Sequence, residues 1–157
     1  YHATLENAIH IVDLMRFYGG EVKEVHAISK FTDPDYESFT TAQLLFESGA
    51  SGMLIADRSS GQWEENIEIH GGNRSVFIKI PDSITITDAE EQHTTEMTPL
   101  AMGWARSEDK LGFSYAIRHF LDCVKEDRVP LTNAVDAYKT HELLDRILRS
   151  AGLPGME

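Results

Sequence analysis

Residues 5–18 show the first regular pattern of apolar and polar positions in the chain. The apolar residues are Ile9, Val12, Leu14, Met15 and Phe17. Their spacing is that of an α-helix with a face turned to a core. Glu6, His10 and Asp13 interrupt the pattern at intervals of four and three residues, which place the three side chains in one stripe along the helix. Glycines at 19–20 follow, as is common where a helix ends. The segment therefore predicts an apolar helix with a polar edge.

From residue 21 to residue 87 the pattern changes to the two-residue alternation of β-strands. We predict a strand at 21–31, a hairpin over 39–61, a second hairpin over 66–80 and a short strand at 83–87. Consecutive strands joined by short turns imply an antiparallel sheet with one buried and one open face. In the first hairpin Ala42, Leu44 and Phe46 share the face that is expected to be buried. The candidates for the open face are Leu45, Met53, Ile55 and Phe77.

Residues 88–110 follow neither period and are rich in acidic residues, which predicts a long loop. Two helices are expected after this loop, over 112–127 and 132–152. The first carries an apolar stripe of Phe113, Ala116, Ile117, Phe120, Leu121 and Val124. The second is expected to turn inward Ala137, Tyr138, Leu144 and Ile147, after a cap at Thr132 or Asn133. The order of elements predicts an α+β fold, a largely antiparallel open-faced β-sheet with helices packed on one face, in a single domain over 1–157.

The composition is that of a globular domain, with 41% hydrophobic and 25% charged residues in 157 positions. The net charge of −12, from 26 acidic and 14 basic residues, produces a surface that repels phosphate and anionic lipid. We therefore expect neither nucleic acid nor a membrane surface as a partner. No apolar run reaches the ~18 residues of a membrane-spanning helix.

The start of the chain has neither a signal-peptide pattern nor an initiator Met, so we expect a processed chain or a piece of a longer one. Cys123 is the only cysteine, which excludes an intrachain disulfide and a thiolate zinc cluster. That usage agrees with a cytoplasmic location, and equally with a secreted protein that is poor in cysteine. Cys123 falls beside an apolar stripe and is expected to pack as a small hydrophobic residue.

The polar stripe of the opening helix is the strongest chemical signal in the sequence. A carboxylate one turn from His10 can hold the imidazole in one tautomer, as a proton-transfer group requires. The alternative is structural, with Glu6 and His10 forming a solvated pair and Asp13 bonding to nearby backbone. These three residue types also ligate metals, but three ligands from one helix at this spacing would strain a tetrahedral site. No metal is therefore predicted.

Other chemical signals are weaker. His70, His93, His119 and His141 are expected at the surface or at the rim of the core. The sequence contains no G-x-S-x-G nucleophile motif and no glycine-rich phosphate-binding loop. No dinucleotide pyrophosphate is therefore expected to bind within these residues.

Four motifs in order resemble one known family. "HIVDLMRFYGG-EVKEVHA" is similar to an H-x-x-D helix followed by a glycine turn and a strand, and "AQLLFESGASGMLIAD" to an F-x-x-G-A-x-G hairpin. "IEIHGGNRSVFI" resembles a strand pair, and the residues from "FSYAIRHFL" to "RILRSA" resemble two closing helices. Together they resemble the C-terminal domain of the glucose–fructose oxidoreductase/inositol dehydrogenase/MocA family of NAD(P)-dependent oxidoreductases.

This resemblance implies a division of labour between two domains. An N-terminal nucleotide-binding (Rossmann) domain, absent from this chain, would supply the site for NAD or NADP and a catalytic Lys. The C-terminal domain would supply groups that bind the substrate and, through its open sheet face, the oligomer interface. By position, His10 is the acid/base or substrate-orienting group. Glu6 stands where the family often has Asp or Asn, and Asp13 matches the motif's acid. Both are expected to bind substrate, and the alternative for Asp13 is to orient the helix.

The resemblance thus predicts the substrate-binding and oligomerisation domain of a cytoplasmic oxidoreductase that acts on a hydroxyl or carbonyl of a sugar, polyol or cyclitol. The expected partners are further copies of the chain, its own Rossmann domain and a small carbohydrate-like substrate. The chain alone is expected to bind no cofactor and to be inactive. The alternative is a non-catalytic dimerisation module of the same fold.

Overall fold

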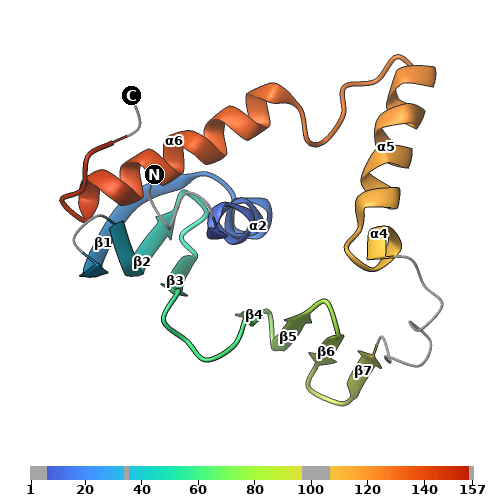
Figure 1. Cartoon of the computed structure of the whole chain (residues 1–157). Coiled ribbons are helices and arrows are strands. Elements are labelled where there is room, and N and C mark those ends of the chain that lie inside the picture. The colour runs from blue at the N-terminus through green and yellow to red at the C-terminus, as the bar shows by residue number, and fades with distance from the viewer. Residues whose placement is uncertain (1–6, 34–35, 97–106, 156–157) are drawn as a thin grey trace. The chain divides into compact units, whose positions relative to one another are not determined.

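The computed structural model describes residues 7–33, 36–96 and 107–155. These residues contain seven strands and four helices, in two compact units (Figure 1). One unit comprises Tyr1–Gly61 and Leu131–Glu157, and the other comprises Gln62–Pro130. The prediction that the whole chain acts as one domain stays a prediction.

The first unit is a three-stranded antiparallel sheet with two helices. Its elements are α2 (Ile9–Gly19), β1 (Val22–Asp33), β2 (Tyr36–Phe46), β3 (Ser51–Asp57) and α6 (Ala134–Ser150). The strand order is β1-β2-β3, so the first hairpin predicted from the sequence is confirmed. Helix α6 contacts β1, and α2 contacts both α6 and β3. Asn133 caps α6, because its side chain accepts hydrogen bonds from the backbone N–H groups of Val135 and Asp136.

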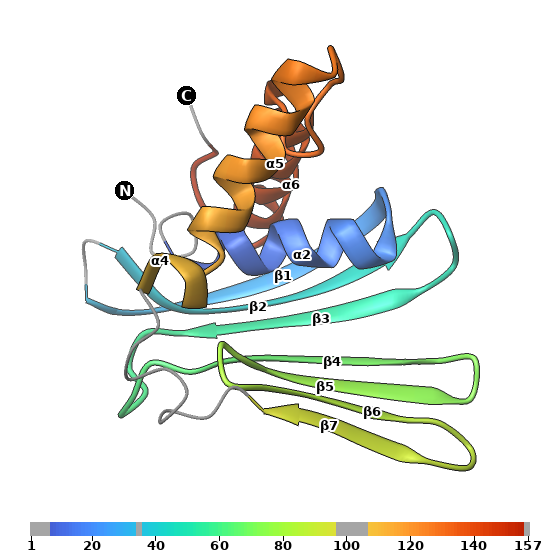
Figure 2. The ribbon, with the colours of Figure 1, turned by 90° about the vertical axis from the view of Figure 1, so that its right-hand side faces the viewer.

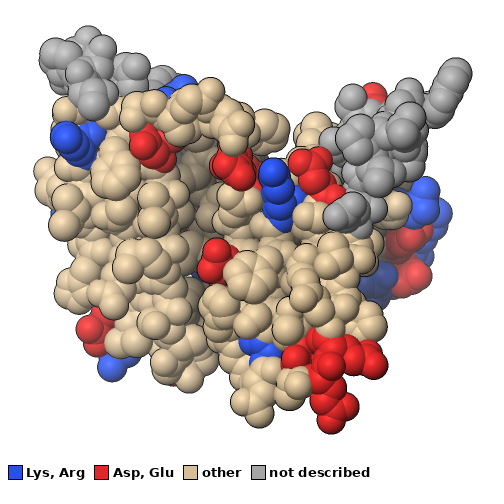
Figure 3. Space-filling view, turned by 90° about the horizontal axis from the view of Figure 1, so that it is seen from below, with Lys and Arg blue, Asp and Glu red and all other residues tan. Residues whose placement is uncertain are grey.

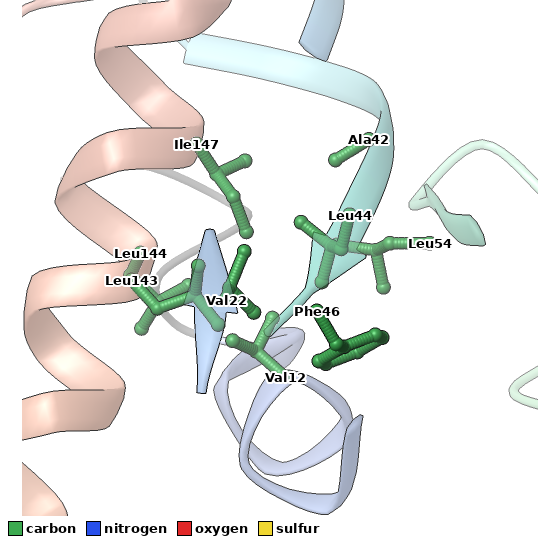
Figure 4. Close-up of a cluster of buried hydrophobic side chains, with 9 residues drawn as sticks. All are labelled: Val12, Val22, Ala42, Leu44, Phe46, Leu54, Leu143, Leu144 and Ile147. Carbon is green, nitrogen blue, oxygen red and sulfur yellow. The ribbon is translucent and has the colours of Figure 1, made fainter. Parts of the chain in front are cut away.

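The core of this unit lies between the two helices and one face of the sheet (Figure 4). Its buried side chains are Val12, Val22, Ala42, Leu44, Phe46, Leu54, Leu143, Leu144 and Ile147. Burial of each larger aliphatic side chain contributes about 1.5–3 kcal/mol. The end of α2 approaches this core closely at Gly19, where an added Cβ would come within 2.5 Å of the Phe46 ring. Gly19 therefore lets α2 end against the sheet.

The other face of this sheet is open. Two cross-strand rows lie on it, His26–Gln43–Met53 and Ile28–Thr41–Ile55. The side chains of Ile28, Met53 and Ile55 are 71%, 64% and 69% exposed. Leu45 shares this face and is half-buried. The predicted register is therefore confirmed for the three candidates in this unit, and Phe77 of the second unit is also exposed.

The outer edge of β1 is covered by side chains from the end of α6. The guanidinium of Arg146 donates to the carbonyls of Val22 and Lys23 at 2.6 and 2.9 Å. Ser150 Oγ donates to the Val25 carbonyl at 3.2 Å and accepts from the Ala27 N–H at 3.0 Å. These bonds occupy backbone groups that an edge strand otherwise offers to another chain.

The second unit contains a four-stranded antiparallel sheet and two helices (Figure 2). Its elements are β4 (Glu65–Gly71), β5 (Arg74–Ile80), β6 (Ser83–Thr87), β7 (Gln92–Glu96), α4 (Ser107–Lys110) and α5 (Phe113–Lys125). The turn between β4 and β5 has positive φ at Gly72 (56°) and Asn73 (59°), as a two-residue hairpin turn requires. The second predicted hairpin and the strand at 83–87 are thus confirmed.

The α+β class and the antiparallel pairing are confirmed, but some elements differ from expectation. The strands form two separate sheets, one of three and one of four strands, instead of the single sheet that was predicted. The predicted loop at 88–110 is wrong where β7 and α4 occur, and residues 97–106 lie outside the described residues. The sequence of β7, QHTTE, is polar on both faces, so no apolar alternation reveals it. It pairs with β6 through its backbone and through a 3.2 Å contact between the Thr85 and Thr94 hydroxyls.

The two C-terminal helices also differ from expectation. In α6, Leu144 and Ile147 are buried as predicted, but Tyr138 is 63% exposed and Ala137 is exposed. Tyr138 lies about 120° around the helix from Leu144, and Ala137 precedes the turn where burial begins at Thr140. All six members of the predicted α5 stripe are exposed.

Charged side chains of both signs are dispersed over the surface. On the face shown in Figure 3, most basic side chains of the described residues lie beside acidic ones. Among the described helices, none is long and apolar enough to cross a membrane.

Candidate active site on helix α2

His10 occupies the first turn of α2 and is exposed. Within the part of the chain that the structure describes, its imidazole has no hydrogen-bond or ion-pair partner. The preceding N-cap residue, Ala8, offers no side-chain acceptor to the helix start. Glu6, the other end of the predicted stripe, lies outside the described residues. A ligand that approaches the start of α2 therefore meets an accessible imidazole.

Asp13 is one turn further along the same helix and is partly engaged. Its Oδ1 accepts a 2.5 Å hydrogen bond from the hydroxyl of Thr140 on α6 and lies 3.7 Å from Nη1 of Arg16. The side chain stays 43% exposed. The structure therefore separates the predicted stripe into an accessible imidazole and a carboxylate that is tied to the neighbouring helix.

Arg16 is the centre of the contacts between α2 and α6. Its side chain is only 7% exposed. Nη1 donates to Thr140 Oγ1 at 2.7 Å and to the Asp136 carbonyl at 3.2 Å, and Nη2 donates to Asp136 Oδ1 at 3.2 Å. Nη2 also reaches Glu21 Oε1 at 3.4 Å. The guanidinium thus meets acceptors from two successive turns of α6.

Glu21 extends this network to the surface. Its carboxylate accepts a 2.8 Å hydrogen bond from Lys139 Nζ. That hydrogen bond lowers the pKa of Glu21 below its ordinary value, against an opposing effect of burial, and the positive charge of Arg16 adds to the lowering. Glu21 therefore stays ionised at neutral pH.

Arg16 and Thr140 were not singled out from the sequence. The available signal was an Asp followed three residues later by an Arg on an otherwise apolar helix, since such a spacing brings the two side chains together. The sequence around Thr140 does not indicate its role. Its partners, Asp13 and Arg16, lie on another helix and become neighbours only when α2 packs against α6.

A shallow pocket of about 240 Å³ lies at the C-terminal end of α2. It is lined by Arg16, Glu21, Val22, Lys139, Glu142, Leu143 and Arg146. His10 is not among these residues, so this pocket belongs to the network between the helices and not to the imidazole.

The remaining candidates behave as surface or packing residues. His70 and His93 are exposed and contact Ser75 and Glu91 at 3.1 and 3.0 Å. Cys123 is buried, with Sγ 3.6 Å from Nε2 of His119. Among the described residues no three His, Cys, Asp or Glu side chains gather as a metal site. The expectation that the chain binds no metal stays a prediction.

The fold class is α+β: the first unit packs α2 and α6 on one face of an antiparallel sheet, and an exposed histidine lies in the first turn of α2. The family model described as the C-terminal alpha/beta domain of an oxidoreductase family matches residues 3–152. The chain therefore belongs to the glucose–fructose oxidoreductase/inositol dehydrogenase/MocA family, as the sequence motifs indicated.

Solved structures of related fold agree with this assignment. An oxidoreductase from Agrobacterium radiobacter, in complex with NAD+, L-tartaric acid and magnesium, matches 95% of this chain at 21% identity and a TM-score of 0.81. A levoglucosan dehydrogenase in complex with NADH and L-sorbose matches 94% at 21% identity and a TM-score of 0.80. A UDP-N-acetylglucosamine 3-dehydrogenase from Acidithiobacillus ferrooxidans matches 91% at 19% identity and a TM-score of 0.76.

The TM-scores show that the fold is shared, and at 19–21% identity these matches show the fold alone. The matched regions cover 46%, 47% and 44% of the three solved chains, so this chain spans a little under half of their length. In the described part of this chain no glycine-rich turn joins a strand to a helix. The expectation that this chain alone binds no dinucleotide stays a prediction.

Proposed function

We propose that the chain is the substrate-binding and oligomerisation domain of an NAD(P)-dependent oxidoreductase that acts on a hydroxyl or carbonyl of a sugar, polyol or cyclitol. The family match supports the oxidoreductase class. Levoglucosan, L-sorbose and a UDP-linked amino sugar appear in the names of structures with the same fold, which supports a carbohydrate-like substrate. NAD or NADP would be held by an N-terminal nucleotide-binding domain of the same polypeptide.

The observation that carries this proposal is the accessible imidazole of His10 on the first turn of α2. An imidazole with no intramolecular partner among the described residues is available to a substrate hydroxyl. In the oxidation direction it takes the hydroxyl proton as the substrate carbon loses hydride, and in the reduction direction it returns that proton to the carbonyl oxygen. The nicotinamide supplies the hydride chemistry when bound.

The two carboxylates are proposed to bind substrate hydroxyls beside His10. Asp13 keeps part of its side chain exposed while Thr140 holds one oxygen, so the carboxylate is both oriented and accessible. Glu6 is assigned to this role by its position four residues before His10. Hydrogen bonds from sugar hydroxyls to such carboxylates are stronger than bonds between neutral groups.

Two exposed apolar surfaces support the proposed partners. The rows that contain Ile28, Met53 and Ile55 on the open sheet face would be covered by a second copy of the chain. The stripe of α5, which includes Phe113 and Phe120, is proposed to be covered by the nucleotide-binding domain, since the match covers only 46% and 47% of two solved chains of this fold. Cytoplasmic location belongs to the same proposal.

The experiment that tests the proposal is His10→Ala in the polypeptide that joins this chain to its nucleotide-binding domain. Loss of a proton-transfer group lowers turnover by about 10²–10⁴-fold. Because His10 is exposed, the melting temperature should change little, since exposed substitutions usually alter stability by about 0.5 kcal/mol or less. The matched control is His141→Ala, an exposed histidine of α6, which should keep full turnover.

The second candidate function is a non-catalytic dimerisation module. The open sheet face favours it, because that face needs a partner whether or not chemistry takes place. Full turnover per folded molecule in His10→Ala would overturn the catalytic role. If the same variant still forms the oligomer, the result would support a non-catalytic dimerisation module as the function.

A further inference from the structure

Arg16 anchors the helix that carries His10, and it does so from a buried position. We infer that Arg16 is a positioning residue, which acts through Thr140 and Asp136 to set the rotation of α2 and thereby the place of the His10 imidazole. The catalytic part of this inference rests on the proposed function of His10. The structural part, that the network sets α2, stands on the contacts of α2 and α6.

The geometry of the network favours one setting of the helix. Asp136 and Thr140 are one turn apart on α6, and the planar guanidinium of Arg16 donates to both. Because the guanidinium donates to two acceptors that lie one turn apart, it fixes the rotation of α2 as well as the distance of α2 from α6. An aliphatic side chain in the same place would fix the distance alone.

Thr140 relays this constraint to the stripe that contains His10. Its hydroxyl accepts from Arg16 Nη1 at 2.7 Å and donates to Asp13 Oδ1 at 2.5 Å. Asp13 lies three residues after His10, on the same edge of α2. The hydroxyl therefore joins the anchor to the turn of the helix that carries the imidazole.

The network is a poor device for stability alone. Arg16 Nε is buried and has no hydrogen-bond partner among the described residues, and an unsatisfied buried donor costs stability. Desolvation of buried charges also offsets much of their attraction, so apolar replacements of buried ion pairs are often neutral or stabilising. What the charged network supplies and an apolar contact does not is a specific orientation.

Orientation matters for a proton-transfer group, because a displacement of about 1 Å from the productive geometry can lower a rate by ~10²-fold. The network lies within the first unit, and its central residue, Arg16, is on the same short helix as His10. A change in the rotation of α2 therefore reaches His10 through only two turns of helix.

The test compares Thr140→Val with Thr140→Ser. Val keeps the shape of Thr and removes the hydroxyl, whereas Ser keeps the hydroxyl. In the two-domain polypeptide, Thr140→Val and Arg16→Lys should lower kcat about 10- to 100-fold with an unchanged KM for the dinucleotide. Thr140→Ser, which keeps the hydroxyl, should keep most of the turnover of the unsubstituted protein. Arg149→Lys, which alters an exposed pair with Asp145 on α6, is the matched control and should match the unsubstituted protein.

A second readout uses this chain without any catalysis. Hydrogen exchange of the backbone amides at 12–16, the first of which donates to the Ala8 carbonyl, should quicken about tenfold in Thr140→Val and Arg16→Lys, while the amides of β2 keep their protection. Unchanged exchange together with unchanged kcat per folded molecule would overturn the positioning role. Faster exchange in these variants, combined with full turnover in His10→Ala, would support the anchor of α2 and overturn the proposed function instead.

Discussion

The two faces of the sheet β1-β2-β3 come from the same strands and differ in what covers them. In β2, Leu44 is fully buried against the helices, whereas its neighbour Leu45 points to the opposite face and is half-buried. On that opposite face Met53 and Ile55 are largely exposed. Apolar alternation therefore shows which residues share a face, but it does not show whether the chain itself covers that face. One face is completed by α2 and α6, and the other is proposed to be completed by a second copy.

The largest expected effect is a difference in stability between matched truncations on the two faces of the sheet. Leu44→Ala should lower the free energy of unfolding by about 2–5 kcal/mol, because it removes buried atoms and leaves a cavity. Leu45→Ala, the same substitution one residue away on the open face, should cost less than about 1 kcal/mol. Urea denaturation of dilute protein measures both values. Equal losses would show that both faces are covered to the same extent in solution.

The fold was largely predictable because its core elements carry strong periodic patterns. The alternation through Ala42, Leu44 and Phe46 predicted which face of β2 is buried. Strand β7 was not predictable, since its polar sequence has no apolar alternation and its pairing depends on β6. Pattern thus identifies elements that bury one face and misses elements held by backbone pairing.

The candidate site was predictable only in part. The spacing of His10 and Asp13 placed them on one helix edge, and the structure agrees that they share α2. The sequence did not reveal that Thr140, 127 positions from Asp13, holds its carboxylate. Local spacing predicts neighbours within an element, whereas a partner on a distant helix is determined by tertiary packing.

The next effect concerns association through the open face. Ile55→Lys places a charge on the open face that is proposed as the interface, which should reduce the oligomer to monomers with little change in monomer stability. Light scattering at micromolar concentration measures the mass. Ile55→Leu, which keeps the apolar surface, is the control and should retain the oligomer. An unchanged mass in Ile55→Lys would exclude this face as the interface.

The smallest expected effect tests the surface end of the network between α2 and α6. Lys139 is the main cause of the lowered pKa of Glu21. A carboxylate with a lowered folded-state pKa contributes stability that is fully present above its unfolded pKa, about 4.3 for Glu, and that is lost as the pH falls through the folded-state value. Lys139→Met should therefore cost stability at pH 7 and should make unfolding less sensitive to pH below about 4.3. Both Glu21 and Lys139 are nearly half exposed, so the loss at pH 7 should be only about 0.2–1 kcal/mol and should shrink in high salt. Unfolding free energies measured at pH 7 and pH 3 give the difference. The control is Lys23→Met, which removes an exposed pair with Glu24 on β1.

The contrary outcome is the same pH dependence in Lys139→Met and in the unsubstituted protein. It would mean that Lys139 does not stabilise ionised Glu21 in solution, and the network that anchors α2 would then end at the buried contacts of Arg16.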